Sequence, residues 1–181
     1  MSTMKHPSPH SSPVVTFTID ELSTPVRGLA GNENDRISMH AIGHNESYSG
    51  VPADKIRENI RIGHMRQVAR IAESLKAVPE GNGTMFDNTM IMYFQEGGET
   101  HHGHGTEAPF VILSGKNCNL NLAGRYIRLP YHATAGRKTI GNWYPTLLNA
   151  HGNPIKHYGD FDLVMSRLKL DQSGAIKQFM S

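Results

Sequence analysis

Thr89-Met-Ile-Met-Tyr-Phe94 is a continuous, mostly apolar run with the length of a β-strand. Such a run is typical of a central strand that is covered on both faces. The run ends at Gln95-Glu-Gly-Gly98, which places the carboxylate of Glu96 just beyond the carboxyl end of the predicted strand. A second run of the same kind predicts another buried strand over residues 108–113.

The chain on either side of these two strands alternates between strand and helix signals. Apolar residues at steps of three and four predict helices, and β-branched and aromatic runs predict strands. The other predicted elements are strands at residues 13–19, 36–42 and 126–129, helices at 52–78 and 139–150, and an amphipathic segment at 163–170. This order is that of an α/β domain. We therefore predict a flexible tail over residues 1–12 and a single α/β domain over residues 13–181.

The composition argues against several classes of partner. The formal net charge is +2, the 18 Lys and Arg residues are scattered, and aromatic residues make up 7% of the chain. We therefore expect no nucleic-acid partner. No apolar run approaches the roughly 18 residues that a membrane span needs, so none is expected. Residues 1–13 lack the apolar core of an export signal, which leaves the localisation open.

The histidines are clustered in a way that indicates a metal site. Of the 11 histidines, two form His40-x-x-x-His44 beside a predicted strand end, and three fall within residues 101–104. Clustered imidazoles are typical of transition-metal ligation. In open α/β sheets such chemistry collects outside the carboxyl ends of the strands, where Glu96 and both clusters are predicted to lie.

Within the second cluster, His102 and His104 share one face of an extended chain, so we favour them over His101 as ligands. The alternative is that both clusters are surface loops and that Glu96 is a solvated strand terminus. His64 lies on the apolar stripe of the first long helix and is interpreted as a hydrogen-bonded core histidine.

Two arginines have alternative interpretations. Arg125 and Arg128 would either contact an anion or lie on the surface, and we prefer the surface interpretation.

Several of these motifs occur together in one known family. Asp87–Gly98, the histidine loop, Ala108–Gly115 and Ala123-Gly-Arg-Tyr126 resemble an uncharacterised family of exported bacterial proteins in the alkaline phosphatase and sulfatase superfamily. The match continues through residues 142–160 and includes residues 39–44 and 14–18 upstream, so the resemblance covers roughly residues 13–160. It implies a partial alkaline-phosphatase-like sheet with flanking helices, equivalent to the carboxy-terminal half of that domain.

The resemblance also implies a metal-ligand set. Where the superfamily has an Asp-x-x-x-His pair at a strand end, this chain has His40 and His44, and where it has Asp-His after a later strand, this chain has Glu96 and a glycine. The superfamily's loop histidine corresponds to His102 or His104. The resemblance therefore implies one divalent metal, for which zinc, manganese or iron suits such mixed ligands.

The function implied is hydrolysis of a small anionic ester. The metal would polarise an ester oxygen of a phosphate or sulfate substrate or activate a water. The superfamily's nucleophile comes from an amino-terminal half that has no counterpart here, so we expect either self-association or a missing amino-terminal half as partner. The alternative function is a non-catalytic structural or interaction domain that keeps the fold and one metal.

Overall fold

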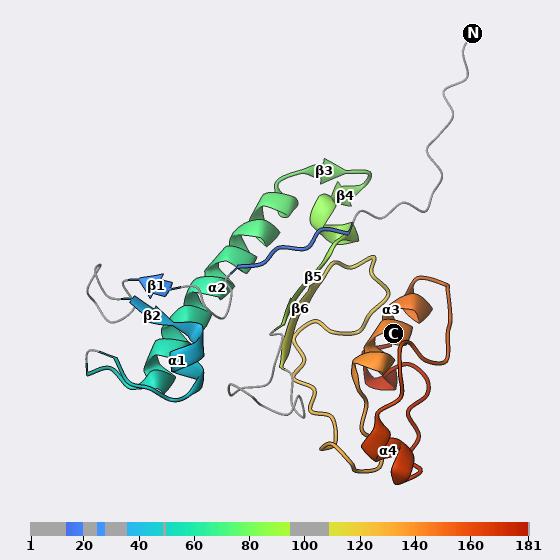
Figure 1. The fold of residues 1–181 in the computed structure, drawn as a ribbon. Coiled ribbons are helices and arrows are strands. Elements are labelled where there is room, and N and C mark those ends of the chain that lie inside the picture. The colour runs from blue at the N-terminus through green and yellow to red at the C-terminus, as the bar shows by residue number, and fades with distance from the viewer. Residues whose placement is uncertain (1–13, 20–24, 28–35, 49, 95–108, 181) are drawn as a thin grey trace.

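The computed structural model describes residues 14–19, 25–27, 36–48, 50–94 and 109–180. These residues form helices and three two-stranded antiparallel sheets (Figure 1). The protein is therefore of the mixed α/β class that the sequence predicts. In chain order the elements are β1 (Pro25–Arg27), β2 (Arg36–Ser38), α1 (Met39–Gly43), α2 (Ala53–Lys76), β3 (Pro79–Glu80), β4 (Gly83–Thr84), η1 (Met85–Asn88), β5 (Met90–Phe94), β6 (Phe110–Ser114), α3 (Ile140–Ala150), α4 (Leu163–Arg167) and η2 (Lys177–Phe179).

The long helix α2 forms where the sequence predicts it. Asp54 lies in its first turn and Lys76 in its last, so both charges are favourable to the helix dipole. One stripe of the helix is buried, as the periodicity predicts, although Ile71 of that stripe is 39% exposed. No helix within the described residues has both the length and the apolar character to cross a membrane. The buried residues of α2 are Ala53, Ile56, Ile60, Val68 and Ala72.

The prediction of one strand over residues 36–42 is wrong, because the chain changes conformation at Ser38. The strand β2 ends there, and the Ser38 hydroxyl accepts a hydrogen bond from the Ala41 N–H at 3.2 Å, which caps the amino terminus of α1. Ile42 of this short helix is fully buried against Ile56 and Ile60 of α2. Capping and burial together therefore override the strand propensity of the run.

The hairpin β5–β6 confirms the two strands predicted around the Gln95–Gly98 motif. Its register pairs Met90 with Ser114 and Phe94 with Phe110. In Figure 1 the hairpin lies between α2 and α3. The strands are not covered on both faces as expected, since Phe94 is 50% exposed. Every strand pair among the described residues is antiparallel, so the carboxyl ends of β5 and β6 lie at opposite ends of the hairpin.

Two predicted strands do not occur. Residues 14–19 and 126–129 have no regular structure, and the side chains of residues 14–19 are exposed. Strand propensity is expressed where a neighbouring strand and a covering surface are present. Within the described residues neither segment is part of a sheet.

The helix α3 joins the hairpin to the end of the chain. Trp143 is 1% exposed, and its ring lies 6.1 Å from that of Phe110 on β6 and 5.7 Å from that of Phe179. The segment predicted to be amphipathic over residues 163–170 forms α4, which is one turn shorter than the pattern suggested. The carboxy-terminal residues thus pack around α3 rather than forming another layer.

Pro145 lies beyond the first turn of α3, and its missing N–H leaves the carbonyl of Gly141 without a partner inside the helix. The N–H of Tyr158 donates to that carbonyl at 3.3 Å. A Cβ added to Gly141 would lie 2.7 Å from the His157 ring, so the absence of a side chain permits this approach. The chain after α3 therefore repairs the gap that the proline leaves in the helix.

Candidate functional site

The first predicted ligand pair is brought together by α1. The ring centroids of His40 and His44 are 4.8 Å apart, with the planes inclined at 59°. His40 lies on the helix and His44 is its carboxy-terminal cap, and both side chains are exposed. The pair therefore lies on a helical turn and not at a strand end as predicted. The i, i+4 spacing brings the two imidazoles close in either case.

Helix α2 holds this turn in place through hydrogen bonds from Arg57. Arg57 donates hydrogen bonds of 2.8 Å to the carbonyl oxygen of Ile42 and to Oδ1 of Asn45. Asn45 has a φ of +64°, a left-handed conformation that asparagine tolerates better than most residues. One guanidinium thus satisfies a carbonyl at the end of α1 and fixes the chain that leaves it.

The carboxyl end of β5 is anchored to the same helix. Nδ1 of the half-buried His64 lies 2.9 Å from the hydroxyl oxygen of Tyr93, the next-to-last residue of β5. This contact confirms the hydrogen bond predicted for His64, although its side chain is half-buried and not part of the core as predicted. Ile56 and Ile60, which pack on α1, precede His64 on α2. A single stretch of helix therefore supports both α1 and the end of β5.

The remaining predicted ligands, Glu96, His102 and His104, lie outside the described residues. Among the residues that are described, no group of three or more His, Cys, Asp or Glu side chains is close enough to hold a metal ion. What the described part of the site contains is two exposed imidazoles, a pair of donors suited to zinc, manganese or iron. These two imidazole donors are compatible with the predicted metal.

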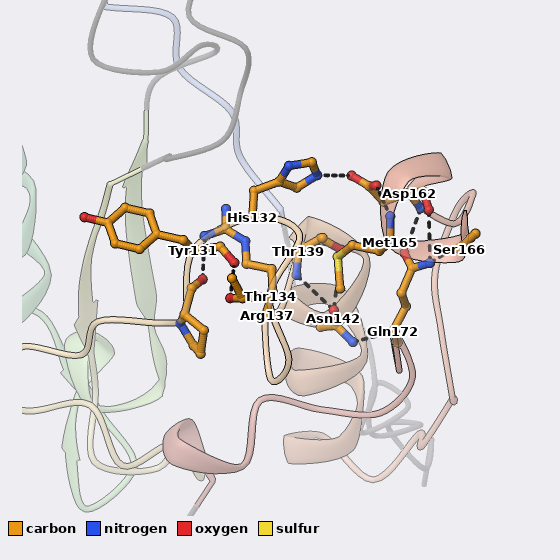
Figure 2. A network of polar contacts seen from close by, with 11 residues as sticks. Tyr131, His132, Thr134, Arg137, Thr139, Asn142, Asp162, Met165, Ser166 and Gln172 are labelled. Atoms are coloured by element: carbon orange, nitrogen blue, oxygen red, sulfur yellow. Dashed lines mark hydrogen bonds and ion pairs between the residues drawn. The ribbon is translucent and has the colours of Figure 1, made fainter. Parts of the chain in front are cut away.

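A second polar cluster, shown in Figure 2, was not predicted from the sequence. Nε2 of His132 lies 2.8 Å from Oδ2 of Asp162. The other carboxylate oxygen accepts a hydrogen bond of 2.9 Å from the N–H of Met165 and so caps α4. This backbone hydrogen bond, followed by the one from His132, holds the pKa of Asp162 below its ordinary value of 3.8.

Asn142 connects this cluster to α3 and is fully buried. Its Oδ1 accepts the N–H of Thr139 at 2.9 Å, and its Nδ2 donates to the carbonyls of Gln172 at 2.7 Å and Gly174 at 2.9 Å. The side-chain amide of Gln172 in turn bonds to both backbone groups of Asp162. Asp162, Asn142 and Gln172 are each held by more than one hydrogen bond, which indicates a structural role for the cluster.

The two arginines considered as anion contacts are used structurally. Nη1 of Arg125 donates to the carbonyls of Asn121 at 2.7 Å and of Gln178 at 2.6 Å. Arg128 donates to the hydroxyl of Tyr131 and lies over its ring. Both side chains are exposed, which agrees with the surface interpretation.

Comparison with known proteins adds no relative, because no family model, curated protein or solved structure matches the chain. The chain is a mixed α/β protein with an exposed pair of histidines on a short helix. The resemblance to the alkaline phosphatase and sulfatase superfamily remains a prediction from the quoted motifs.

Proposed function

We propose that the chain is a metal-dependent hydrolase-like domain of the alkaline phosphatase and sulfatase type. Its metal would be bound by His40, His44, Glu96 and either His102 or His104. The observation that carries this proposal is the 4.8 Å separation of the two imidazole rings on the exposed turn of α1. Two imidazoles at this separation on a solvent-accessible turn can converge on one transition-metal ion.

The common support from α2 gives the proposal a second argument. The stretch from Ile56, which packs on α1, to His64, which bonds to Tyr93, rises about 12 Å along the helix axis. Glu96 follows Tyr93 by three residues, a reach of at most about 10 Å of extended chain. The same helix therefore supports both the turn that carries the histidine pair and the strand that precedes Glu96, as the proposed ligand set requires.

The proposal also assigns β5 and β6 to a partial alkaline-phosphatase-like sheet flanked by α2 and α3. It is supported by contacts on each side of the hairpin: His64 of α2 bonds to Tyr93 of β5, and Trp143 of α3 packs on Phe110 of β6. These contacts give the hairpin a helix on either flank, as a sheet of that kind requires.

The chemistry would depend on the metal, whereas the chain would orient the ligands. A bound divalent ion supplies Lewis-acid assistance to a phosphate or sulfate ester. The turn that carries His40 and His44 is held by the Ser38 cap, by burial of Ile42 and by the two hydrogen bonds from Arg57. These contacts hold the helical turn from which both side chains extend.

The test is elemental analysis of the full chain after loading with zinc, manganese or iron and removal of excess metal. We expect about one ion per chain, with His40→Ala and Glu96→Ala each losing at least nine-tenths of it. His151→Ala is the matched control, because His151 is also an exposed histidine at the carboxy-terminal end of a helix. This control variant should keep its metal.

Absence of metal from the unmodified chain, or retention of it by His40→Ala, would overturn the metal site. Turnover separates the two functions that a bound metal allows. A metal-loaded chain that hydrolyses an aryl phosphate or aryl sulfate, and loses this activity in His40→Ala, is a hydrolase. A chain that binds metal but hydrolyses neither ester supports the non-catalytic alternative instead.

A further inference from the structure

The outer edge of β6, on the side away from β5, carries backbone groups that play no part in the hairpin. The N–H of Gly115 donates to the carbonyl of Thr89 at 2.9 Å, in the register of the hairpin. Ladder hydrogen bonds join every second pair of an antiparallel register, so Leu113 and Val111 bond to β5 and the groups between them point outward. Within the described part of the chain none of these outward groups has a hydrogen-bond partner. They belong to Phe110, Ile112 and Ser114.

A hollow of about 500 Å³ lies along this outer edge. The three consecutive residues 112–114 line it, although neighbouring side chains of a strand point to opposite faces of the sheet. The hollow therefore follows the edge of β6 and not one face of the hairpin. A strand residue occupies about 160 Å³ at the usual rise, strand spacing and sheet spacing, so the hollow has room for about three residues of an added strand.

The same chain contains a strand-forming segment that belongs to no sheet of the described structure. This segment, residues 14–19, is exposed and has the sequence Val-Val-Thr-Phe-Thr-Ile, drawn in blue in Figure 1. Val15, Phe17 and Ile19 alternate with two threonines, a pattern typical of a strand with one covered face. Phe17 is 71% exposed, so the single chain leaves that face uncovered.

Charge favours a contact between this segment and the region around β6. Residues 109–180 contain nine Lys and Arg against three Asp, whereas the segment is followed directly by Asp20 and Glu21. Arg125 lines the hollow, and among the described residues no carboxylate pairs with it. A basic region with an unneutralised arginine attracts an acidic stretch of chain.

We propose that residues 14–19 of one copy of this chain add to the outer edge of β6 in a second copy, as a third strand. The outward backbone groups of β6 form the new ladder, and the apolar side of the segment covers Val111, which is 43% exposed in the single chain. Each copy carries both a segment and an edge, so two copies exchange segments symmetrically and every contact occurs twice. The third strand also stabilises the hairpin, because two strands alone are marginal.

The test is sedimentation equilibrium of the full chain over a concentration series, with two variants that each block one side of the contact. Thr16→Pro/Phe17→Pro blocks the segment, because prolines at two successive positions remove an N–H from each of its edges. Val111→Lys blocks the edge of β6, since it sets a charge against the apolar side of the incoming strand. All three side chains are exposed, so neither variant leaves a cavity in the core.

We expect each blocked variant to raise the dimer dissociation constant at least tenfold. An equimolar mixture of the two should form a mixed dimer at a concentration where neither associates alone, because the intact segment of Val111→Lys can add to the intact edge of the proline variant. The matched controls are Ser11→Pro/Ser12→Pro, with its prolines outside the segment, and Val111→Thr, which keeps a β-branched side chain. Both controls should associate as the unmodified chain does.

Three outcomes would overturn the exchange of segments. The first is an unmodified chain that stays monomeric at every concentration, as it would if the segment paired only within its own copy. The second is dissociation by Val111→Lys but not by the two prolines, which would mean that two β6 edges pair with each other. The third is a mixture that stays monomeric, or an equal loss of association in a control. Circular dichroism of each variant checks that the fold is retained.

Discussion

Helix α2 and the segment of residues 130–180 are held in place by different forces. α2 is a regular helix of 24 residues that buries one apolar stripe and leaves most of its charged side chains in solvent. Residues 130–180 have much less regular structure, yet side chain to backbone hydrogen bonds cross them repeatedly (Figure 2). Buried polar side chains thus hold an irregular chain in place through hydrogen bonds to its backbone.

The difference has an energetic consequence. Apolar contacts such as those of α2 have no required direction, so neighbouring apolar side chains can partly fill the space left by a substituted residue. A buried amide such as that of Asn142 has partners in defined positions, and its removal leaves those partners without hydrogen bonds. We therefore expect the largest single-residue effects on stability in residues 130–180.

Asn142→Ala should give the largest effect. The change removes four hydrogen bonds and leaves the carbonyls of Gln172 and Gly174 without this donor, at an expected cost of about 3 kcal/mol. Urea unfolding followed by circular dichroism measures it. Asn149→Ala is the matched control on the same helix and should change the unfolding free energy by less than about 0.5 kcal/mol. Equal effects of the two changes would contradict the network.

The same contrast explains which parts of the fold the sequence could predict. The helices α2 and α3 and the strands β5 and β6 were predicted because apolar periodicity and apolar runs are local signals. The helix α1 was missed because it depends on a single cap by Ser38 and on burial of Ile42 against another helix. Residues 14–19 were assigned to a strand because propensity does not reveal whether a partner strand is present.

For the site, the sequence predicted the proximity of His40 and His44 but not the helical turn that brings them together. The pair His132 and Asp162 was missed since 30 residues separate them and no spacing rule joins them. A local signal was nevertheless present for Asp162, which precedes an apolar run as helix-capping residues do. His132 carries no comparable signal, because its role is defined only by the folded chain.

Asp162→Ala should lower the unfolding free energy by an intermediate amount. The pH dependence of this loss tests the network. The loss of the α4 cap and of the contact with His132 should cost about 1.5 kcal/mol at pH 7. Because the pKa of Asp162 is lowered in the folded chain, its ionised form favours folding. This contribution is fully present above the ordinary pKa of 3.8 and is lost as the pH falls through the lowered value.

Unfolding free energies of Asp162→Ala and of the unmodified chain, determined between pH 7 and pH 2, measure this dependence. The difference between the two unfolding free energies should narrow at the acid end of the range. Asp162→Asn serves as the control, since asparagine also caps helices well and should recover most of the lost stability at pH 7. A gap that is the same at every pH would contradict the role of the ionised carboxylate.

The smallest predicted changes in unfolding free energy have opposite signs in α2 and in residues 130–180. Gly63 lies in the interior of α2, and a Cβ added there meets open space. Gly63→Ala should therefore raise the unfolding free energy by about 0.5 to 1 kcal/mol, the usual gain in helix propensity. At Gly141 the same change drives a Cβ to within 2.7 Å of the His157 ring and 3.0 Å of the Tyr158 carbonyl oxygen.

Overpacking of this kind costs about 1 to 3 kcal/mol, which exceeds the propensity gain, so Gly141→Ala should lower the unfolding free energy by about 1 kcal/mol. Thermal and urea unfolding of the two variants side by side measure both signs. His157→Ala combined with Gly141→Ala removes the ring that the new methyl group meets, and should recover part of the loss. If Gly141→Ala stabilised the chain as Gly63→Ala does, residues 157–158 would not pack on α3, and the contrast between the two regions would fail.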